Sequence, residues 1–181
     1  MRIHWLYNSI SLKKSGLTDM LNFIIDKTDI EILKALQHDA GISNIELADK
    51  VSLSPSPCSR RVKLLEEAGF FRGKVTLLNP KSVGLPVNVF MQITLIRQKK
   101  SHLEVFEEEI SQWPEVMECY LMTGDFDYLI RVAVPDLISY QVFLDKVTEM
   151  DGISHIKSSF SLKQICYKTE LPLGHLKVLI R

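Results

Sequence analysis

The sequence predicts an α+β protein with two domains, an N-terminal winged helix-turn-helix domain and a C-terminal ferredoxin-like βαββαβ domain. Two short helical segments follow each other between residues 43 and 68 with almost no connection, as in a helix-turn-helix unit. Between residues 87 and 167, strands of alternating apolar residues are interleaved with two amphipathic helices. A stretch rich in turn residues, 79–86, separates the two patterns and is the predicted linker.

The composition is that of an ordinary globular protein. The 181 residues include 22 basic and 22 acidic side chains, so the formal net charge is zero. With 46% hydrophobic and 24% charged residues, the chain is neither disordered, nor collagen-like, nor a strongly basic nucleic-acid tail. No run approaches the roughly 18 apolar residues that a membrane-spanning helix needs.

The cysteines and histidines indicate no disulfide framework and no metal site. The three cysteines are far apart and form no Cys-x-x-Cys pair, and the five histidines lack metal-ligand spacing. We therefore predict no metal, no catalytic centre and a cytoplasmic location. The cysteines are Cys58, Cys119 and Cys166.

Residues 1–21 show no clean period and are interpreted as an N-terminal extension. The apolar pair Trp5–Leu6 is too short for a signal peptide. Met20 offers a second start for the protein. The alternative is a short ordered arm that packs on the first domain.

Three helix starts are expected in the first domain, residues 22–78. Two are capping boxes and the third pairs a serine cap with a proline at the first helical position. The third helix is expected to run to about Ala68 and to stop at Gly69. Residues 70–78 then alternate around Gly73 and predict a small strand or wing. The three starts are Thr28-Asp29-Ile30-Glu31, Ser43-Asn44-Ile45-Glu46 and Ser54-Pro55.

The third helix has an apolar face and a face of hydroxyls and cations. On a helical wheel Cys58, Val62 and Leu65 face the core. Ser56, Arg60 and Lys63 lie opposite them, flanked by Ser59 and Leu64. Residues 50–74 contain six basic and two acidic side chains, although the whole chain is neutral. A helix that reads the major groove of DNA needs such a face. The alternative is a solvated helix on a bundle.

The second domain is expected over residues 87–174, followed by a tail at 175–181. The alternating strand 87–95 has one wetter face. A helix at 101–113, strands at 116–122 and 128–134, a helix opened by Pro135-Asp136 and one or two strands within 153–167 complete the βαββαβ order. Because helices cover only one face of such a sheet, we expect a second subunit to cover the other.

Several motifs in one order make the chain similar to the Lrp/AsnC family of transcription regulators. The resemblance covers roughly residues 21–173. In the second domain it also includes Pro114-Glu115-Val116. The other motifs are ISNIELA at 42–48, LSPSPCSRRV at 53–62, LLEEAG at 64–69, LLNP at 77–80, GDFDYL at 124–129, SSF at 158–160 and LPL at 171–173.

The resemblance implies a DNA-binding regulator rather than an enzyme. Its second domain, of the RAM or ACT-like type, is expected to dimerise through its sheet, and dimers to assemble into tetramers or octamers. The effector implied is an amino acid, leucine or another apolar one, bound between subunits near the loop 123–128. Two departures stand out: residues 39–41 read Asp-Ala-Gly where the family has Asp-Gly-Arg, and residues 73–76 read Gly-Lys-Val-Thr where it has Gly-Tyr-Thr-Ala.

The DNA partner is expected to be double-stranded, read by the third helix. Hydroxyls at a helix N-terminus suit phosphates, and arginine suits guanine edges. The candidate DNA-binding residues are Ser54, Ser56, Pro57, Ser59, Arg60, Arg61 and Lys63.

The effector-binding region is expected at the glycine turn between the second and third strands of the second domain. Backbone N–H groups of such a turn can hold a carboxylate, and Asp125 and Asp127 could accept bonds from an α-ammonium. Met122, Phe126 and Phe160 could provide an apolar pocket. The alternative is that this segment is only a hairpin turn. The candidate residues are Met122, Thr123, Gly124, Asp125, Phe126, Asp127, Phe160 and Ser161.

Two other functions are alternatives to regulation of transcription. One is an amino-acid-sensing protein with a vestigial helix-turn-helix and no role on DNA, and the local basic excess argues against it. The other is an enzyme built on the second domain. The sequence shows no nucleophile–base pair, metal cluster or phosphate loop, and Asp125 and Asp127 alone are weak support for acid–base chemistry.

Overall fold

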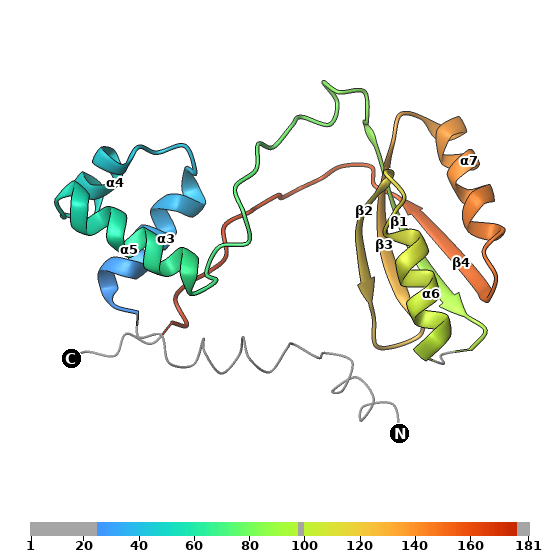
Figure 1. Cartoon of the computed structure of the whole chain (residues 1–181). Helices are drawn as coiled ribbons and strands as arrows, with labels where there is room; N and C mark the ends of the chain where they lie inside the picture. Colours follow the sequence, from blue (N-terminus) through green and yellow to red (C-terminus); the bar gives the residue numbers. More distant parts are fainter. Residues whose placement is uncertain (1–24, 98–99, 177–181) are drawn as a thin grey trace. The chain divides into compact units, whose positions relative to one another are not determined.

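A computed structural model describes residues 25–97 and 100–176 (Figure 1). The described chain forms two compact units, a helical unit of residues 25–76 and 167–176 and a sheet unit of residues 77–97 and 100–166. The predicted extension, residues 1–21, lies outside the described residues. In the described parts of the chain, no helix is both long and apolar enough to cross a bilayer.

The helical unit contains three helices, α3 (Lys27–His38), α4 (Asn44–Lys50) and α5 (Pro55–Glu67). Their apolar faces meet in one core, and the predicted inward face of α5 is confirmed, since Cys58 and Leu65 are fully buried. Burial raises the pKa of the Cys58 thiol, as expected of a small buried side chain. The buried residues are Ile25, Ile30, Ile32, Leu33, Ala35, Leu36, Leu47, Ala48, Cys58 and Leu65.

The first helix begins earlier than predicted. The capping box at Thr28 is wrong, because Asp26 is the N-cap residue and exchanges hydrogen bonds with Asp29. The Asp29 N–H donates to Asp26 Oδ1 at 2.9 Å, and the Asp26 N–H donates to Asp29 Oδ2 at 3.0 Å. Aspartate is at least as good an N-cap residue as threonine, and capping at Asp26 starts the helix two residues earlier. The predicted box at Ser43 and Glu46 is confirmed.

The turns after α4 and α5 have the same hydrogen bonds but different residues at the left-handed position. In both turns, two successive N–H groups donate back into the last helical turn. The pairs are Ser52 to Asp49 and Leu53 to Ala48 after α4, and Gly69 to Glu66 and Phe70 to Leu65 after α5. Gly69 has φ +76°, whereas the residue after α4 is Ser52 with φ +56°. Ser52 therefore carries backbone strain that Gly69 avoids.

This pair of turns predicts stability changes of opposite sign. Ser52→Gly should raise the free energy of unfolding of the helical unit by about 0.5 kcal/mol, since glycine tolerates a positive φ. Gly69→Ala should lower it by about 1 kcal/mol for the converse reason. A Cβ at Gly69 would meet nothing within 4 Å, so the effect there is conformational and not steric. Urea unfolding of both variants checks the signs, and a loss of stability in Ser52→Gly would contradict the argument.

No strand forms in the described residues 70–79, so the small strand predicted over 70–78 is not observed. Phe70 and Phe71 pack against the helical core, but the alternating apolar residues that follow bury no face. Val75 is 80% exposed and Leu78 is 68% exposed. A two-stranded ribbon without a buried face is at best marginally stable.

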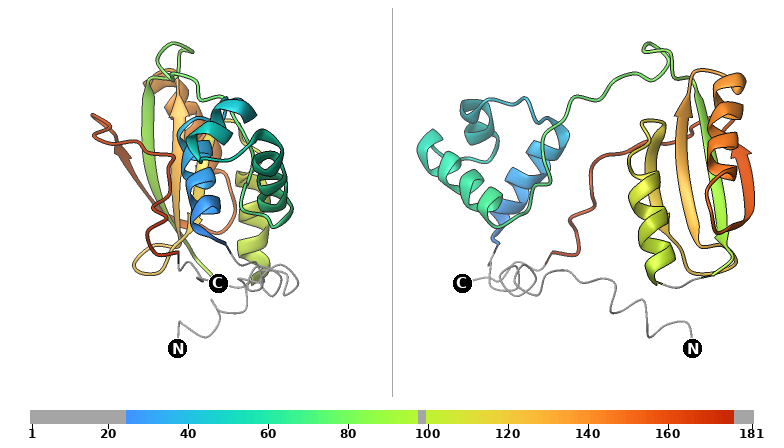
Figure 2. Two further views of the ribbon diagram at one scale, coloured as in Figure 1. Left: turned by 90° about the vertical axis from the view of Figure 1, so that its left-hand side faces the viewer. Right: turned by 45° about the vertical axis from the view of Figure 1, so that its right-hand side comes forward.

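The sheet unit is a four-stranded antiparallel sheet in the order β2-β3-β1-β4, as the predicted βαββαβ topology requires. Its strands are β1 (Val87–Leu95), β2 (Val116–Leu121), β3 (Tyr128–Val134) and β4 (Ile153–Phe160). Helices α6 (Lys100–Ile110) and α7 (Leu137–Thr148) pack on one face (Figure 2). Alternate residues of β1, from Val89 to Leu95, point into that core, which confirms the predicted strand and its wetter face.

The core between helices and sheet is aromatic. Phe143 meets Trp113 edge to face at 5.5 Å between ring centroids, and Phe106 lies 4.6 Å from Tyr128. Helix α6 ends at Ile110, before the predicted end at residue 113, because Pro114 disfavours helical geometry at Trp113. Helix α7 starts at the predicted cap, Asp136.

Two details of the second domain make the prediction more specific. Leu137, the first residue of α7, is 64% exposed, whereas Tyr140 one turn later is buried. The region 153–167 supplies one strand in the described chain, and it ends at Phe160. Residues 161–166 carry no strand, and Leu162 and Ile165 are exposed.

The last described residues, 167–176, belong to the helical unit. Leu173 and Leu176 pack against the core of the three helices. The Leu171 N–H donates to Gln37 Oε1 at 2.7 Å, and Glu170 pairs with His38 at 2.9 Å. The sequence predicted instead that the second domain continues to Gly174. The chain thus passes between the units twice, after Thr76 and again after Cys166.

Candidate DNA interface and effector-binding region

The helix-turn-helix holds the start of α5 in a fixed position. The side chain of Asn44, the first residue of α4, donates from Nδ2 to the Pro55 carbonyl at 2.9 Å. The Leu53 N–H donates to the Ala48 carbonyl at 2.9 Å and closes the turn between the helices. The N-termini of α4 and α5 are therefore joined by a direct hydrogen bond.

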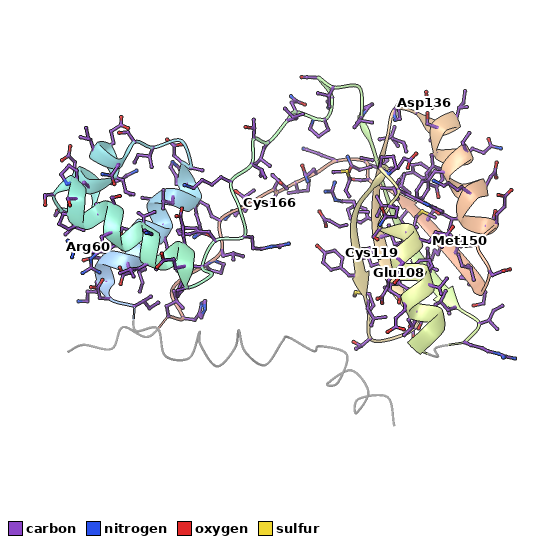
Figure 3. The ribbon with its side chains drawn as sticks, in the orientation of Figure 1. Arg60, Glu108, Cys119, Asp136, Met150 and Cys166 are labelled. Carbon is purple, nitrogen blue, oxygen red and sulfur yellow. The ribbon has the colours of Figure 1, made fainter. Side chains whose placement is uncertain are left out.

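The N-terminal half of α5 presents a polar, exposed face. Ser54 is the N-cap, but its hydroxyl makes no capping hydrogen bond to α5. The Arg60 guanidinium is exposed, and no described residue forms an ion pair with it (Figure 3). Lys63 lies 3.7 Å from Glu67 in an exposed, loose pair. The exposed candidates are Ser54, Ser56, Pro57, Ser59, Arg60 and Lys63.

Arg61 differs from the other DNA candidates because it is half-buried and paired inside the helical unit. Its Nη1 lies 2.8 Å from Asp26 Oδ2 and 2.8 Å from Asp29 Oδ1. The hydrogen bond to Asp29 is the main cause of a raised pKa for the guanidinium. Arg61 therefore ties α5 to the start of α3, and we do not include it in the DNA interface proposed below.

The loop between β2 and β3 contains six of the eight effector candidates, and one of them has a structural role. Asp127 is 7% exposed, and its Oδ2 accepts the Leu95 N–H at 2.8 Å. The Asp127 backbone N–H donates to the Ile93 carbonyl at 2.9 Å, and its carbonyl accepts from Met122 at 2.7 Å. Asp127 thus fixes the loop to the end of β1. Asp125 is exposed at the loop tip, beside Gly124 at φ +128°.

Phe160 and Ser161, the other two effector candidates, lie at the opposite end of the sheet. Phe160 pairs with Val89 near the start of β1, whereas the loop bonds to Ile93 and Leu95 at its end. Four residues of strand, about 13 Å, separate the two positions. The structure therefore does not bring Phe160 together with Met122 and Phe126 within one chain.

The sheet face away from the helices carries a polar network that the sequence analysis did not single out. Arg131 donates from Nε to Glu118 Oε1 at 2.9 Å and from Nη1 to Asn88 Oδ1 at 3.0 Å. Tyr120 donates to the other Glu118 oxygen at 3.0 Å. These bonds lower the pKa of Glu118, although burial acts in the opposite sense and is the largest single influence. The one available signal was Arg131 itself, a cation inside an apolar strand.

This open face also borders a hollow of about 770 Å³. Asn88, Phe90 and Arg131 form its floor, and residues of the linker and of 161–166 form its walls. Phe90 and Tyr120 are exposed on the same face. A half-exposed sheet face of this kind has the character of an association surface.

The described residues contain no cluster of three or more metal-ligating side chains. The two remaining cysteines, Cys119 and Cys166, form no disulfide. Burial raises the pKa of the Cys119 thiol to about 11, so it is not an activated nucleophile.

Comparisons with known proteins match both units. The Lrp/AsnC ligand binding domain matches residues 88–171, and a winged helix-turn-helix DNA-binding domain matches residues 25–72. The chain is 41% identical over 150 residues to the Bkd operon transcriptional regulator of Pseudomonas aeruginosa, covering 82% of this chain and 98% of that one. It is 37% identical over 142 residues to the leucine-responsive regulatory protein of Escherichia coli, covering 78% and 87%.

A crystal structure shows the same arrangement of elements. It is a transcriptional regulator of Neisseria meningitidis in complex with L-methionine, with a TM-score of 0.80 and 41% identity. The match covers 83% of this chain and 98% of that one. The chain therefore belongs to the Lrp/AsnC family of DNA-binding transcription regulators, which respond to amino-acid effectors and are not enzymes.

Proposed function

We propose that the N-terminal half of α5 reads the DNA and that Arg60 makes the principal base contact. The observation that carries this proposal is the Arg60 guanidinium, which is exposed and free of ion pairs within the described chain. Arginine pairs with guanine O6 and N7 in the major groove. Lys63 and the hydroxyls of Ser54 and Ser56 contact phosphates, helped by the Ser56 N–H, since Pro55 and Pro57 carry no N–H.

We propose further that two copies pair through the open sheet face. The exposed aromatic side chains Phe90 and Tyr120 support this, since they lie beside the Arg131–Glu118 pair. A dimer presents two α5 helices to half-sites about 34 Å apart, one turn of DNA. Assembly of dimers into tetramers or octamers, and a location in the cytoplasm with the DNA, belong to the same proposal.

The effector in this proposal is an apolar L-amino acid, leucine or methionine. Its support is the family's ligand-binding domain and the relatives, one named for its leucine response and one crystallised with L-methionine. Met122 and Phe126 are half-buried at the loop, and the exposed Asp125 suits an α-ammonium. Because Phe160 and Ser161 lie far from this loop in one chain, a second copy supplies them or other groups to complete the site.

Arg60→Ala tests the DNA contact. The duplex is one selected by the full-length protein from a random pool. We expect binding to weaken by about 1–3 kcal/mol and selectivity to relax at one base pair of each half-site. Binding isotherms against the selected duplex and its single-base variants measure both effects.

The control for Arg60→Ala is Lys34→Ala, an exposed α3 cation whose partner is Glu31. Equal weakening of Arg60→Ala on all sequences would make Arg60 a phosphate contact. Failure of the parent chain to enrich any duplex would favour the rival sensor without a DNA role.

The effector assignment is tested by titrating L-leucine and L-methionine into the full chain, with heat of binding and light scattering as readouts. We expect binding of at least one of them, with a change in assembled mass, and loss of that binding in Asp125→Ala. Unchanged binding in Asp125→Ala would place the ligand elsewhere.

A further inference from the structure

The end of α3 provides a docking site for an extended segment, and the chain's own residues 167–176 occupy it. Gln37 bonds to the backbone of Leu171 in both directions, accepting its N–H at 2.7 Å and donating to its carbonyl at 3.4 Å. The Gln37 side-chain amide thus bonds to the backbone of Leu171 as an adjacent β-strand would. This contact depends on the backbone of the segment and not on its side chains.

Two further contacts hold the same segment. Glu170 pairs with Nδ1 of His38 at 2.9 Å, and both groups are exposed, so the pair adds orientation more than stability. Leu173 and Leu176 pack into the helical core, with a turn closed by the Leu176 N–H bonding to the Leu173 carbonyl at 3.1 Å. Apolar burial supplies the affinity, and Gln37 sets the position of the segment.

By its contacts the docked segment belongs to the helical unit, whereas its first residues belong to the matched ligand-binding domain. The Lrp/AsnC ligand binding domain matches residues 88–171, which includes Glu170 and Leu171. Both residues contact α3 of the DNA-binding unit. Between the end of β4 at Phe160 and Glu170 lie only residues 161–169, which span at most about 32 Å when fully extended. The other connection, residues 68–86, is about twice as long, and Phe70 and Phe71 near its start pack on the helical core.

We propose that residues 167–176 form a strap that couples the ligand-binding sheet to the DNA-binding helices, with Gln37 as its positioning residue. A change at the end of β4 moves the short connection and hence α3. Docking and ligand state are then linked, so binding at either unit alters the other. This inference rests on the proposed function only in its choice of ligand.

Hydrogen exchange on the full chain tests the docking first, without any ligand. In the parent, the amides of Leu171 and Leu176, whose N–H groups are hydrogen-bonded, should exchange at least about tenfold more slowly than in an unstructured peptide. Gln37→Leu removes the acceptor of the Leu171 N–H, so that amide should lose its protection while the sheet unit is unchanged. The matched control is Lys34→Leu, which places the same side chain one turn earlier on α3, at a lysine that pairs with Glu31. Rapid exchange of both amides in the parent would overturn the proposal.

Coupling is tested by adding the selected DNA duplex to the same samples. In the parent and in Lys34→Leu, DNA binding should change the exchange of β1 and β4 amides. In Gln37→Leu that change should disappear, while the dissociation constant for DNA shifts by less than about fivefold. Persistence of the DNA-induced change in the sheet of Gln37→Leu would refute the strap.

L-Methionine provides the reverse measurement and separates the two proposals. If L-methionine binds, the ratio of the DNA dissociation constants measured with and without it should approach one in Gln37→Leu. The heat of L-methionine binding should be unchanged in that variant. If neither L-methionine nor L-leucine binds the parent, the effector assignment fails. The DNA-induced exchange in the sheet still decides whether the strap couples the units.

Discussion

Replacing Arg61 by alanine should lower the free energy of unfolding of the helical unit by about 3 kcal/mol. Arg61 bridges Asp26 and Asp29, with 2.8 Å to an oxygen of each. Asp29 is 6% exposed, so its charge is left without a cationic partner inside the fold. Removing Arg61 costs more than the group contributes, because the buried Asp29 carboxylate loses its cationic partner, whereas Asp26 is partly solvated.

The pH dependence of this effect follows from the pKa of Asp26. Burial raises that pKa, but the hydrogen bond from the Asp29 backbone and the contacts with Arg61 outweigh it, and the net direction is downward. A carboxyl with a depressed pKa in the folded state stabilises the fold above its ordinary pKa and loses that contribution as the pH falls. The difference between parent and Arg61→Ala should therefore shrink below about pH 4.

Arg60→Ala is the matched control for stability. Arg60 adjoins Arg61 in sequence but is exposed and has no ion pair in the described chain, so its loss should change stability by less than about 0.5 kcal/mol. Urea unfolding followed by circular dichroism measures both variants from pH 3 to 7 (about the range over which carboxylates titrate). Similar losses in the two variants would contradict the assigned roles.

Phe143→Ala should destabilise the sheet unit by about 3–5 kcal/mol. Phe143 is 2% exposed and packs edge to face on Trp113, in the centre of the core between α7 and the sheet. Its removal leaves a cavity that the rigid strands cannot fill, and it removes the aromatic pair. Lys146 also packs on Trp113, with its Nζ 3.9 Å from the centre of the ring.

The neighbouring Val142 supplies the control for Phe143. It is 65% exposed on the outer side of α7, and Val142→Ala should alter stability by less than about 0.5 kcal/mol. Unfolding is followed by Trp113 fluorescence in a Trp5→Phe background. A loss below 1 kcal/mol for Phe143→Ala would mean that the core collapses around the gap, contrary to the packing described.

The strands were predictable where the alternation of apolar residues was regular. The alternation in β1 defines its core face, and the predicted bounds of β1 and β3 are the observed ones. The buried face at the start of α7 and the segment 70–78 were harder to predict, because exposed residues such as Leu137 and Val75 are as apolar as buried ones. Hydrophobicity alone does not say whether a partner is present.

The starts of α4, α5 and α7 were predicted at their caps, but the start of α3 was predictable only to within a turn. Thr28 with Glu31 and Asp26 with Asp29 both have the spacing of a capping box, and the apolar period fits either start. Arg61 decides between them, since it lies beside Asp26 and Asp29 in the fold. That contact joins residues more than thirty positions apart, so no local pattern reveals it.

In the candidate sites, too, features set by a local pattern were predictable and features set by long-range contacts were not. The exposed face of α5 follows from helical periodicity and was predicted, including Arg60. The separation of Phe160 from the loop at Asp127 depends on strand register, which the sequence does not fix when several pairings bury the same face. Asp127 was assigned to a ligand, yet the fold uses its carboxylate on the Leu95 N–H.

The order in which the chain is made gives the docked segment one more consequence. The helical unit is encoded first, but Leu173 and Leu176, which complete its core, follow the whole sheet unit in sequence. During synthesis from the N-terminus, the three helices emerge with part of their apolar surface uncovered. These contacts form only after the sheet unit has been translated. The DNA-binding unit therefore precedes the sheet unit in the chain but gains part of its apolar packing after it.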